Sequence, residues 1–312
     1  MKPKYLINFI SDYQQYSYYS LSVKNSHLSQ SWIYGEAKKK SQGWEVVRAV
    51  IIENEKPIAI VQAWLKKFLF FTLCRISYGP LWIIENPSLE QIKNVFYLIK
   101  KQFGLQKLSV FSIAPNLENC PDNNKIMSDL GFYKRKSMAF ESGLIDLTQT
   151  KEILRSKLRQ NWRNQLTSSE KKGLSFQISQ TKDDFVWIIS CFKQLRKEKN
   201  FYGHSVYFLN DLYHCAFDCE KTLISIVSQN NERIAGMLFP LHGTSSVPLI
   251  IWVGSNGRKL NAGNFLLWNS ILYAKEKGCL LFDLGGTNNS TAFKTGLPHT
   301  PYQMIGEYYG FI

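Results

Sequence analysis

The sequence predicts an α/β protein built of two related units in tandem, because of its length and because a succession of elements is repeated. A chain of 312 residues holds about two domains at roughly 150 residues each. Glu53–Ile60 and Gln229–Gly236 each have the pattern of a strand, a polar turn and a returning strand. The same kinds of element follow both segments in the same order, as in an internal repeat. An accidental succession of ordinary hairpins and helices is the alternative.

The elements that follow the hairpins can be matched between the two halves. The matched pairs are strands 75–84 and 247–254, helices 88–103 and 262–277, and closing strands 107–111 and 279–283. Gly104 and Gly278 stand between the helix and the closing strand, where the backbone must turn sharply. The boundary falls near 144–150, so the predicted domains are 1–147 and 148–312.

Composition and charge narrow the functional classes. Hydrophobic residues make up 45% and charged residues 20% of the chain, which is typical of a packed globular protein. The net charge of +14 favours a polyanionic partner, namely nucleic acid, anionic lipid or a phosphorylated substrate. No apolar run approaches the roughly 18 residues that cross a bilayer, and the N-terminus has no pattern of a signal peptide. We expect a cytoplasmic protein, with peripheral contact at the inner face of the membrane left open. The scattered cysteines predict neither a metal site nor a cofactor.

Residues 151–172 are predicted to form a basic amphipathic helix. Leu154, Leu158, Trp162 and Leu166 recur at every fourth position and form an apolar stripe. Thr148 or Thr150 can cap this helix, and Gly173 can end it. The charged and amide side chains around the stripe are Lys151, Arg155, Lys157, Arg159, Arg163, Lys171 and Lys172, the acids Glu152 and Glu170, and the amides Asn161, Asn164 and Gln165. Either a solvated face or a contact with phosphates accounts for this excess of basic residues.

No motif of a catalytic nucleophile, of a zinc protease or of a Walker loop is present in the sequence. The segment that suits an acyl donor is instead the buried strand 249–254 with the turn that follows it. Ser255–Asn261 leads from this strand into the helix that begins near Ala262. Because unpaired N–H groups and the positive end of the helix dipole meet at a helix N-terminus, this turn favours a donor that carries phosphate.

Two sets of segments in the sequence resemble known protein families. Arg258–Gly263 resembles the pyrophosphate loop of GNAT acyltransferases, with Asn261 in place of the first glycine. A broader likeness rests on Gln30–Lys38, Ile76–Pro80, Lys157–Arg163, Phe282–Gly286 and Phe293–Gly296. This series resembles the Fem-type (FemABX) aminoacyltransferases, which build peptidoglycan cross-bridges, and it extends from about Gln30 to Ile312.

The Fem-type resemblance implies a fold and a reaction. It implies an α/β protein of two tandem GNAT-like domains, each a mixed central sheet flanked by helices. It also implies a non-ribosomal aminoacyltransferase, which moves an amino acid from aminoacyl-tRNA to an amine of a peptidoglycan precursor, either a lipid-linked or a nucleotide-linked muropeptide. Phe293 and Lys294 fall on the family's Phe-Lys pair near the tRNA end, and Lys38 falls on a basic residue that contacts the precursor phosphates. The chain lacks the long charged helical hairpin of some members and resembles the compact ones.

The chemistry of an ester donor sets the roles of the candidate residues. An activated ester needs no enzyme nucleophile, but its tetrahedral intermediate needs a donor for the oxyanion, which Lys294 or the N–H groups of strand 250–254 can supply. Asp283 ends a buried strand beside Gly285-Gly286, and either accepts the amine proton or caps the turn. A surface position is the alternative for Lys294. The other expected site residues are Lys38, Phe293, Trp252 and Gly254 for substrate, and Arg258, Lys259, Asn261, Gly263, Arg155, Arg159 and Arg163 for phosphates of tRNA or coenzyme A.

Two rival functions stay open at this point. The first is an acyl-CoA-dependent GNAT N-acyltransferase acting on a small or saccharide-linked amine, because the Arg258–Gly263 loop keeps part of the coenzyme A signature. The second is a non-catalytic RNA-binding or membrane-surface protein. The sequence predicts neither the amino acid carried nor an oligomeric state.

Overall fold

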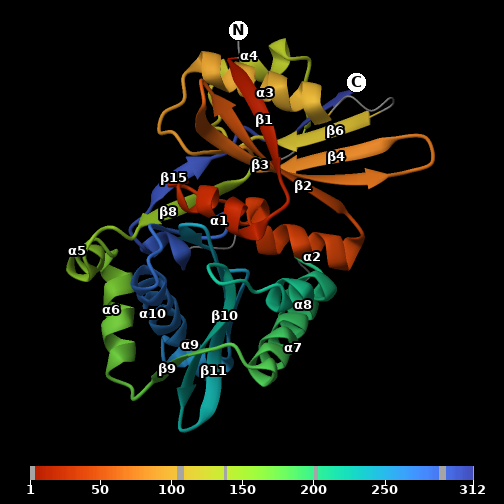
Figure 1. Cartoon of the computed structure of the whole chain (residues 1–312). Coiled ribbons are helices and arrows are strands. Elements are labelled where there is room, and N and C mark those ends of the chain that lie inside the picture. The colour runs from red at the N-terminus through yellow and green to blue at the C-terminus, as the bar shows by residue number, and fades with distance from the viewer. Residues whose placement is uncertain (1–3, 104–108, 137–138, 200–202, 288–292, 312) are drawn as a thin grey trace. The chain divides into compact units, whose positions relative to one another are not determined.

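The computed structural model (Figure 1) describes residues 4–103, 109–136, 139–199, 203–287 and 293–311. The chain divides into two compact units, Met1–Glu141 with Tyr302–Ile312, and Ser142–Pro301. The sequence instead assigned all of 148–312 to the second domain. The assignment differs because strand β16 (Tyr308–Phe311) pairs antiparallel with β6 (Ser109–Ala114), with Tyr308 opposite Ile113. Ile305 and Tyr308 are buried in the core of the first unit, so the end of the chain belongs to that unit.

The first unit contains a mixed sheet of eight strands in the order β1-β2-β3-β4-β6-β16-β7, with β5 beside β3. The remaining strands are β1 (Tyr5–Ile10), β2 (Glu45–Glu53), β3 (Lys56–Lys67), β4 (Thr72–Ser77), β5 (Leu81–Trp82) and β7 (Tyr133–Lys134). β4 and β6 run parallel. The predicted strand 75–84 is interrupted at residues 78–80, where Tyr78 adopts a left-handed φ of 50° and Pro80 has no N–H to donate.

Two layers of helices cover the first sheet. Helices α3 (Leu89–Phe103) and α4 (Pro121–Asp129) pack on one face, where Val95 and Phe96 meet alternate residues of β3 such as Val61. Helix α1 (Tyr13–Leu21), the 3₁₀ turn η1 (Leu28–Gln30) and α2 (Trp32–Gln42) lie on the other face. There the buried Gln62 of β3 accepts a hydrogen bond from Arg48 Nε at 2.7 Å and donates Nε2 to two carbonyls near the start of α2. The alternation along β3 therefore places Val61 in the apolar core on one face and the hydrogen-bonded side chain of Gln62 on the other.

The second unit also contains a mixed sheet of eight strands, in the order β15-β8-β14-β12-β11-β10-β9, with β13 beside β11. Its strands are β8 (Glu141–Asp146), β9 (Ser175–Ser179), β10 (Lys221–Gln229), β11 (Glu232–His242), β12 (Ser245–Ser246), β13 (Ile250–Val253), β14 (Leu281–Asp283) and β15 (Thr300–Gln303). β12 and β14 run parallel, whereas β10 pairs antiparallel with both β9 and β11. Both sheets are thus mixed and flanked by helices, which confirms the expected fold class.

The repeated hairpins that the sequence predicts are present in both sheets. β2 and β3 are joined by Asn54 and Glu55, and β10 and β11 by Asn230 and Asn231, all of which have positive φ angles between 47° and 69°. Two consecutive left-handed residues form the tight turn whose twist matches paired antiparallel strands, and asparagine tolerates this conformation well. The polar turn residues are therefore the local cause of both hairpins.

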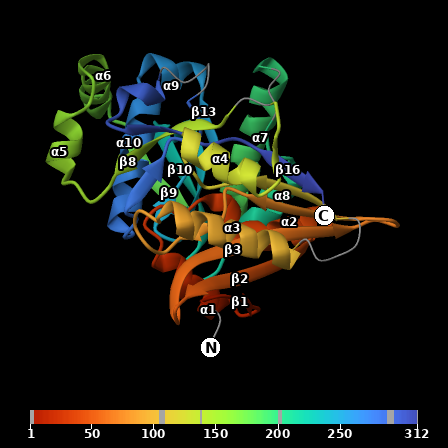
Figure 2. The same ribbon diagram turned by 90° about the horizontal axis from the view of Figure 1, so that it is seen from above.

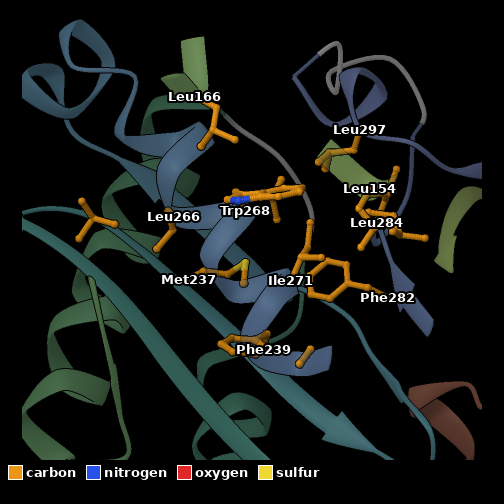
Figure 3. Close-up of a cluster of buried hydrophobic side chains, with 14 of the residues drawn as sticks. Leu154, Leu166, Met237, Phe239, Leu266, Trp268, Ile271, Phe282, Leu284 and Leu297 are labelled. Atoms are coloured by element: carbon orange, nitrogen blue, oxygen red, sulfur yellow. The ribbon is translucent and has the colours of Figure 1, made fainter. Parts of the chain in front are cut away.

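Helices α6 (Gln160–Glu170) and α10 (Ala262–Glu276) lie on one face of the second sheet, and α7 (Lys182–Lys199) and α8 (Val206–His214) on the other (Figure 1). Figure 3 shows the core on the α10 side, where Trp268 and Ile271 pack against Met237 and Phe239 of β11. Burying each large apolar side chain contributes about 1.5–3 kcal/mol. On the opposite face a Cβ added to Gly236 would lie 2.6 Å from the ring of Trp187, so α7 packs directly on the backbone of β11.

The predicted single helix 151–172 is two helices, α5 (Lys151–Ser156) and α6, separated at residues 157–159. The predicted stripe of Leu154, Leu158, Trp162 and Leu166 is buried throughout, and Thr150 caps α5 by accepting from the N–H of Ile153. One straight helix would hold residues 155 and 170 about 22 Å apart. Because the chain bends between the helices, Arg155 instead reaches Glu170 at 2.6 Å.

Among the described residues, none of the helices combines the length and the apolar composition needed to cross a bilayer. Seen from above in Figure 2, α3 and α4 lie side by side over the strands of the first unit.

Candidate active site

A cavity of about 770 Å³ opens in the second unit, which is within the usual range for small-ligand sites. Its described lining comes from α6, α7, β13, the start of α10 and the turn at residues 293–296. The lining residues are Arg159, Asn161, Trp162, Gln165, Leu195, Lys199, Ile251, Val253, Arg258, Asn261, Gly263, Asn264, Phe293, Lys294 and Gly296. Four of these are cationic and, within this described lining, none is acidic. The cavity therefore favours an anionic ligand.

Lys294 is half-buried at the wall of this cavity and is not a surface residue in bulk water. Its Nζ donates a hydrogen bond of 2.5 Å to the carbonyl of Leu284 and one of 3.4 Å to that of Gly285. Burial lowers the pKa of Lys294 to about 8, while the nearby charge of Asp283 opposes this shift. Because this pKa is above 7, the side chain is mostly protonated at neutral pH and presents a cation to the cavity.

Helix α6 and the turn at residues 293–296 are locked together. Trp162 Nε1 donates to the carbonyl of Phe293 at 2.9 Å, and the N–H of Arg159 donates to the carbonyl of Gly296 at 3.0 Å. A Cβ at Gly296 would lie 2.5 Å from Trp162 Cδ1, so only glycine allows this approach. These contacts join two segments, 157–163 and 293–296, that carry separate parts of the Fem-type resemblance. Their packing explains physically why both belong to one site.

Asp283 holds the turn that positions Lys294. Its Oδ1 accepts hydrogen bonds from Ser142 Oγ at 2.5 Å and from the N–H of Gly285 at 2.7 Å. Ser142 Oγ in turn accepts from the N–H of Gly286 at 3.0 Å. Of the two roles expected for Asp283, turn capping is the one for which the contacts are present, and Asp283 is not among the residues that line the cavity.

The turn between β13 and α10 has the form expected of a phosphate-binding loop. A short helix, α9 (Ser255–Lys259), follows β13, and Asn261 then adopts a left-handed φ of 56° before α10 begins at Ala262. Asparagine is one of the residues that tolerate this conformation, as glycine does. The first N–H groups of α10 have no partner within the helix, and Asn261 and Gly263 line the cavity.

Some of the expected site residues of the second unit lie away from the cavity lining. Arg155 forms a two-point ion pair with Glu170, with both N–O distances 2.6 Å, and its guanidinium is engaged there. Arg163 donates Nη2 to the carbonyl of Leu158 at 3.2 Å. The structure therefore brings Arg159 to the cavity but not the other two arginines of this segment.

Trp252, Gly254 and Lys259 are also outside the lining. Trp252 packs edge-on against Trp187 of α7, with ring centroids 5.7 Å apart. Because side chains alternate along a strand, Ile251 and Val253 line the cavity and Trp252 lies on the other face of the sheet. Lys259 is exposed, and its carbonyl accepts a hydrogen bond from Lys172 Nζ at 3.2 Å.

Lys38 belongs to the first unit and lies against two stacked aromatic rings. Its Nζ is 5.4 Å from the ring centroid of Trp64 and 5.7 Å from that of Tyr34. Nζ also donates to Gln42 Oε1 at 3.0 Å. Burial lowers the pKa of Lys38 to about 8, and the positive charge of Arg75 adds to this effect. The aromatic rings and Gln42 fix the position of this ammonium, and a lysine ammonium can bind a phosphate as a point charge.

Lys199, Leu195 and Asn264 line the cavity but were not expected from the sequence. Asn264 donates Nδ2 to Gln165 Oε1 at 3.2 Å and so joins α10 to α6. Lys199 is the last residue of an ordinary amphipathic helix, where lysine is common as a partner of the helix dipole. No local signal could have distinguished this lysine, because only the packing of α7 beside β13 brings it to the cavity.

Comparisons with known proteins agree with this geometry. Residues 156–295 match the family model of the acetyltransferase (GNAT) domain. Among solved structures the chain is similar to FemX, with a TM-score of 0.83 at 16% identity over 98% of this chain and 97% of that one. It is also similar to L-PGS from Bacillus licheniformis, with a TM-score of 0.52 at 14% identity over 96% and 91% of the two chains. A tandem GNAT protein from the clavulanic acid biosynthesis pathway has a TM-score of 0.52 at 8% identity over 98% of both chains. No curated protein sequence matches the chain.

The matched GNAT segment contains every residue that lines the cavity except Gly296. The structural likenesses confirm the expected fold, and the domain match bears out the expectation of an acyltransferase. The chain therefore has the Fem-type, tandem GNAT-like fold, and its residues 156–295 match the model of the GNAT acetyltransferase domain.

Proposed function

We propose that the protein is a non-ribosomal aminoacyltransferase that moves an amino acid from aminoacyl-tRNA to an amine of a peptidoglycan precursor. The observation that carries this proposal is the half-buried Lys294 in the wall of a cavity whose described charged residues are all cationic. A polyanionic donor is attracted to such a cavity. The similarity of the whole chain to FemX at a TM-score of 0.83 supports the same reading.

The reaction needs positioning and an oxyanion donor but no enzyme nucleophile. The unprotonated acceptor amine attacks the ester carbonyl carbon, and a C–N bond forms as the carbonyl oxygen becomes an oxyanion. The intermediate then collapses, the C–O bond to the terminal ribose breaks, and an amide remains. The ribose oxygen leaves as a hydroxyl and takes up the equivalent of the proton that the amine nitrogen gives up.

Lys294 stabilises the oxyanion in this scheme. Its ammonium has three N–H donors, and the contacts with the carbonyls of Leu284 and Gly285 leave one for the substrate. The two carbonyls fix the position of Nζ before the reaction, so little reorganisation is needed as charge develops. Because the pKa of Lys294 is about 8, this stabilisation is present at pH 7 and is lost as the pH rises through 8.

The remaining cations of the cavity bind the donor. Arg159 precedes α6, Arg258 lies in α9 and Lys199 ends α7, so these three charges come from separate elements around one cavity. The side chain of Arg258 is oriented by a hydrogen bond of 2.7 Å from Nη1 to the carbonyl of Val253. We assign these side chains to phosphates near the aminoacylated end of the tRNA. In the first unit we assign Lys38 to the phosphates of the acceptor.

A second candidate is an acyl-CoA-dependent N-acyltransferase. Two observations favour it: residues 156–295 match the GNAT acetyltransferase domain, and Asn261 and Gly263 of the segment that resembles the pyrophosphate loop line the cavity. The same Lys294 would then stabilise the oxyanion formed from a thioester, with the thiol as the leaving group.

Donor use separates the two candidates. The purified chain is offered radiolabelled aminoacyl-tRNA or radiolabelled acetyl-coenzyme A, each with a nucleotide-linked and a lipid-linked muropeptide. We expect label to pass from aminoacyl-tRNA only, and to be lost in Lys294→Ala but kept in Lys171→Ala, whose lysine is exposed and outside the cavity. Transfer from acetyl-coenzyme A alone would overturn the first proposal in favour of the second.

A further inference from the structure

The tip of the β3–β4 hairpin is an exposed apolar segment, Phe68–Phe71, in the first unit. Leu69 is 95% exposed and Phe70 is 81% exposed, and the other two phenylalanines are 46% and 40% exposed. In Figures 1 and 2 this orange hairpin extends past the ends of the neighbouring strands. Contiguous exposed apolar side chains of this kind mark interaction sites on folded proteins.

The tip is built as an ordered turn. The N–H of Phe68 donates to the carbonyl of Phe71 at 2.8 Å, which closes the loop between the last residue of β3 and the first of β4. The rings of Phe68 and Phe71 stack with centroids 4.7 Å apart and an angle of 16° between their planes. Leu69 and Phe70 lie between the stacked pair in the sequence and are the two most exposed residues of the tip.

The composition of this tip departs from that of the other long hairpins in the same chain. The β2–β3 hairpin turns on Asn54-Glu55 and the β10–β11 hairpin on Asn230-Asn231, as is normal for turns that face water. The β3–β4 turn has four consecutive apolar residues and no turn-forming residue. The requirements of a turn therefore do not explain the apolar composition of Phe68–Phe71, whereas insertion into an apolar medium does.

A group of lysines surrounds the base of the hairpin. We define this basic collar as Lys39, Lys40, Lys66 and Lys67. Lys66 Nζ donates to the carbonyl of Gln42 at 2.9 Å, so the end of α2, where Lys39 and Lys40 are exposed, lies beside the hairpin. The acidic neighbour Glu45 lies 3.8 Å from Lys67 Nζ and offsets one of these charges. The collar thus keeps a positive charge next to an apolar tip.

We propose that the Phe68–Phe71 tip inserts into the surface of an anionic lipid bilayer, with the basic collar on the headgroups. The apolar side chains at the tip suit the acyl-chain region of such a bilayer. The lysines, which lie behind the tip, suit its anionic headgroups. A four-residue tip is too small to supply the roughly 800 Å² that each side of a stable protein interface buries. The proposal goes beyond the proposed function, because it holds whichever acyl donor the cavity takes.

Vesicle sedimentation tests this proposal. The full chain is mixed with sucrose-loaded vesicles of phosphatidylcholine with one quarter phosphatidylglycerol, and with vesicles of phosphatidylcholine alone. We expect the native chain to bind the anionic vesicles, and the double variant Leu69→Ser/Phe70→Ser to bind them at least tenfold more weakly. Binding by Tyr207→Ser is expected to be unchanged, although Tyr207 on α8 is as exposed as Phe70, at 81%. Lys66→Gln and Lys67→Gln are each expected to weaken binding about fivefold and to reduce its dependence on salt.

Control measurements show whether a loss of vesicle binding comes from the tip itself and not from misfolding or lost activity. Circular dichroism and thermal unfolding check that each variant folds, and transfer to a nucleotide-linked muropeptide in solution is expected to be unchanged in Leu69→Ser/Phe70→Ser. Equal binding of the native chain and this double variant, or no binding of the native chain to anionic vesicles, would overturn the proposal. So would self-association in sedimentation velocity without lipid that disappears in the double variant, because the tip would then be an interface between copies.

Discussion

Replacing Lys294 with methionine is expected to remove transfer activity without destabilising the folded chain at neutral pH. Methionine is apolar and has a similar length, so it fills the same space without a charge. In the folded chain, burial lowers the pKa of Lys294 from 10.5 to about 8. The unfolded chain therefore binds this proton more tightly than the folded chain. The resulting cost to folding is present below about pH 8 and disappears as the pH rises toward 10.5.

The expected size follows from the shift in pKa. At about 1.4 kcal/mol for each pKa unit, the buried charge of Lys294 costs roughly 3 kcal/mol at pH 7. The variant also loses the donor to the carbonyls of Leu284 and Gly285, which costs about 1–3 kcal/mol. At pH 7 we therefore expect Lys294→Met to be as stable as the native chain, or up to about 2 kcal/mol more stable. Between pH 7 and pH 10 the free energy of unfolding of the variant is expected to fall by about 2–3 kcal/mol relative to that of the native chain.

Urea unfolding followed by circular dichroism, at pH 7 and at pH 10, measures the free energy of unfolding of both chains. Lys171→Met, which changes an exposed lysine, is the matched control and should show the same difference from the native chain at both pH values. In the transfer assay, kcat of Lys294→Met is expected to fall about 10²–10³-fold, the usual cost of removing one oxyanion donor. A stability difference that does not change with pH would contradict a buried charge at Lys294, and full activity would contradict its role as the oxyanion donor.

Three further predictions concern the residues around this lysine. Trp162→Phe removes the hydrogen bond from Nε1 to the carbonyl of Phe293, and it is expected to lower the free energy of unfolding by about 1 kcal/mol and kcat about tenfold. Unchanged kinetics would show that this contact does not position the site. Arg159→Gln is expected to weaken aminoacyl-tRNA binding about fivefold and to reduce the slope of log affinity against log salt concentration by about one, whereas Arg155→Gln leaves the affinity unchanged. Equal losses of affinity in filter binding would contradict the placement of these two arginines. Asn261→Gly should keep its stability within about 0.5 kcal/mol and Asn261→Val should lose about 1–2 kcal/mol in urea unfolding, because Asn261 has a φ of 56°; equal stabilities would argue against the left-handed turn.

Local patterns in the sequence were sufficient for the elements whose causes are local. The asparagines of the two hairpin turns, the helices near 88–103 and 262–277, and the buried stripe of 151–172 all agree with the structure. Each depends on neighbours a few residues apart, through turn conformation or through apolar residues at helical spacing. Lys294 could be proposed only through the Fem-type resemblance, since nothing in its own neighbourhood distinguishes it from a surface lysine.

The remaining features depend on contacts between residues far apart in the chain, which become visible only in the folded structure. The Arg155–Glu170 pair accompanies the bend between α5 and α6, and the pairing of β16 with β6 returns the last residues to the first unit. The face of β13 that lines the cavity, and hence the placement of Trp252 on the opposite face, depends on the packing of α7. Local composition was enough to predict the two hairpins, the helices near 88–103 and 262–277 and the positive charge, because each depends on neighbouring residues or on the sum of the charges. The packing of α6, α7, α10 and the Phe293–Gly296 turn around one cavity decided which cations share a site, because that choice is made by side chains meeting across the fold.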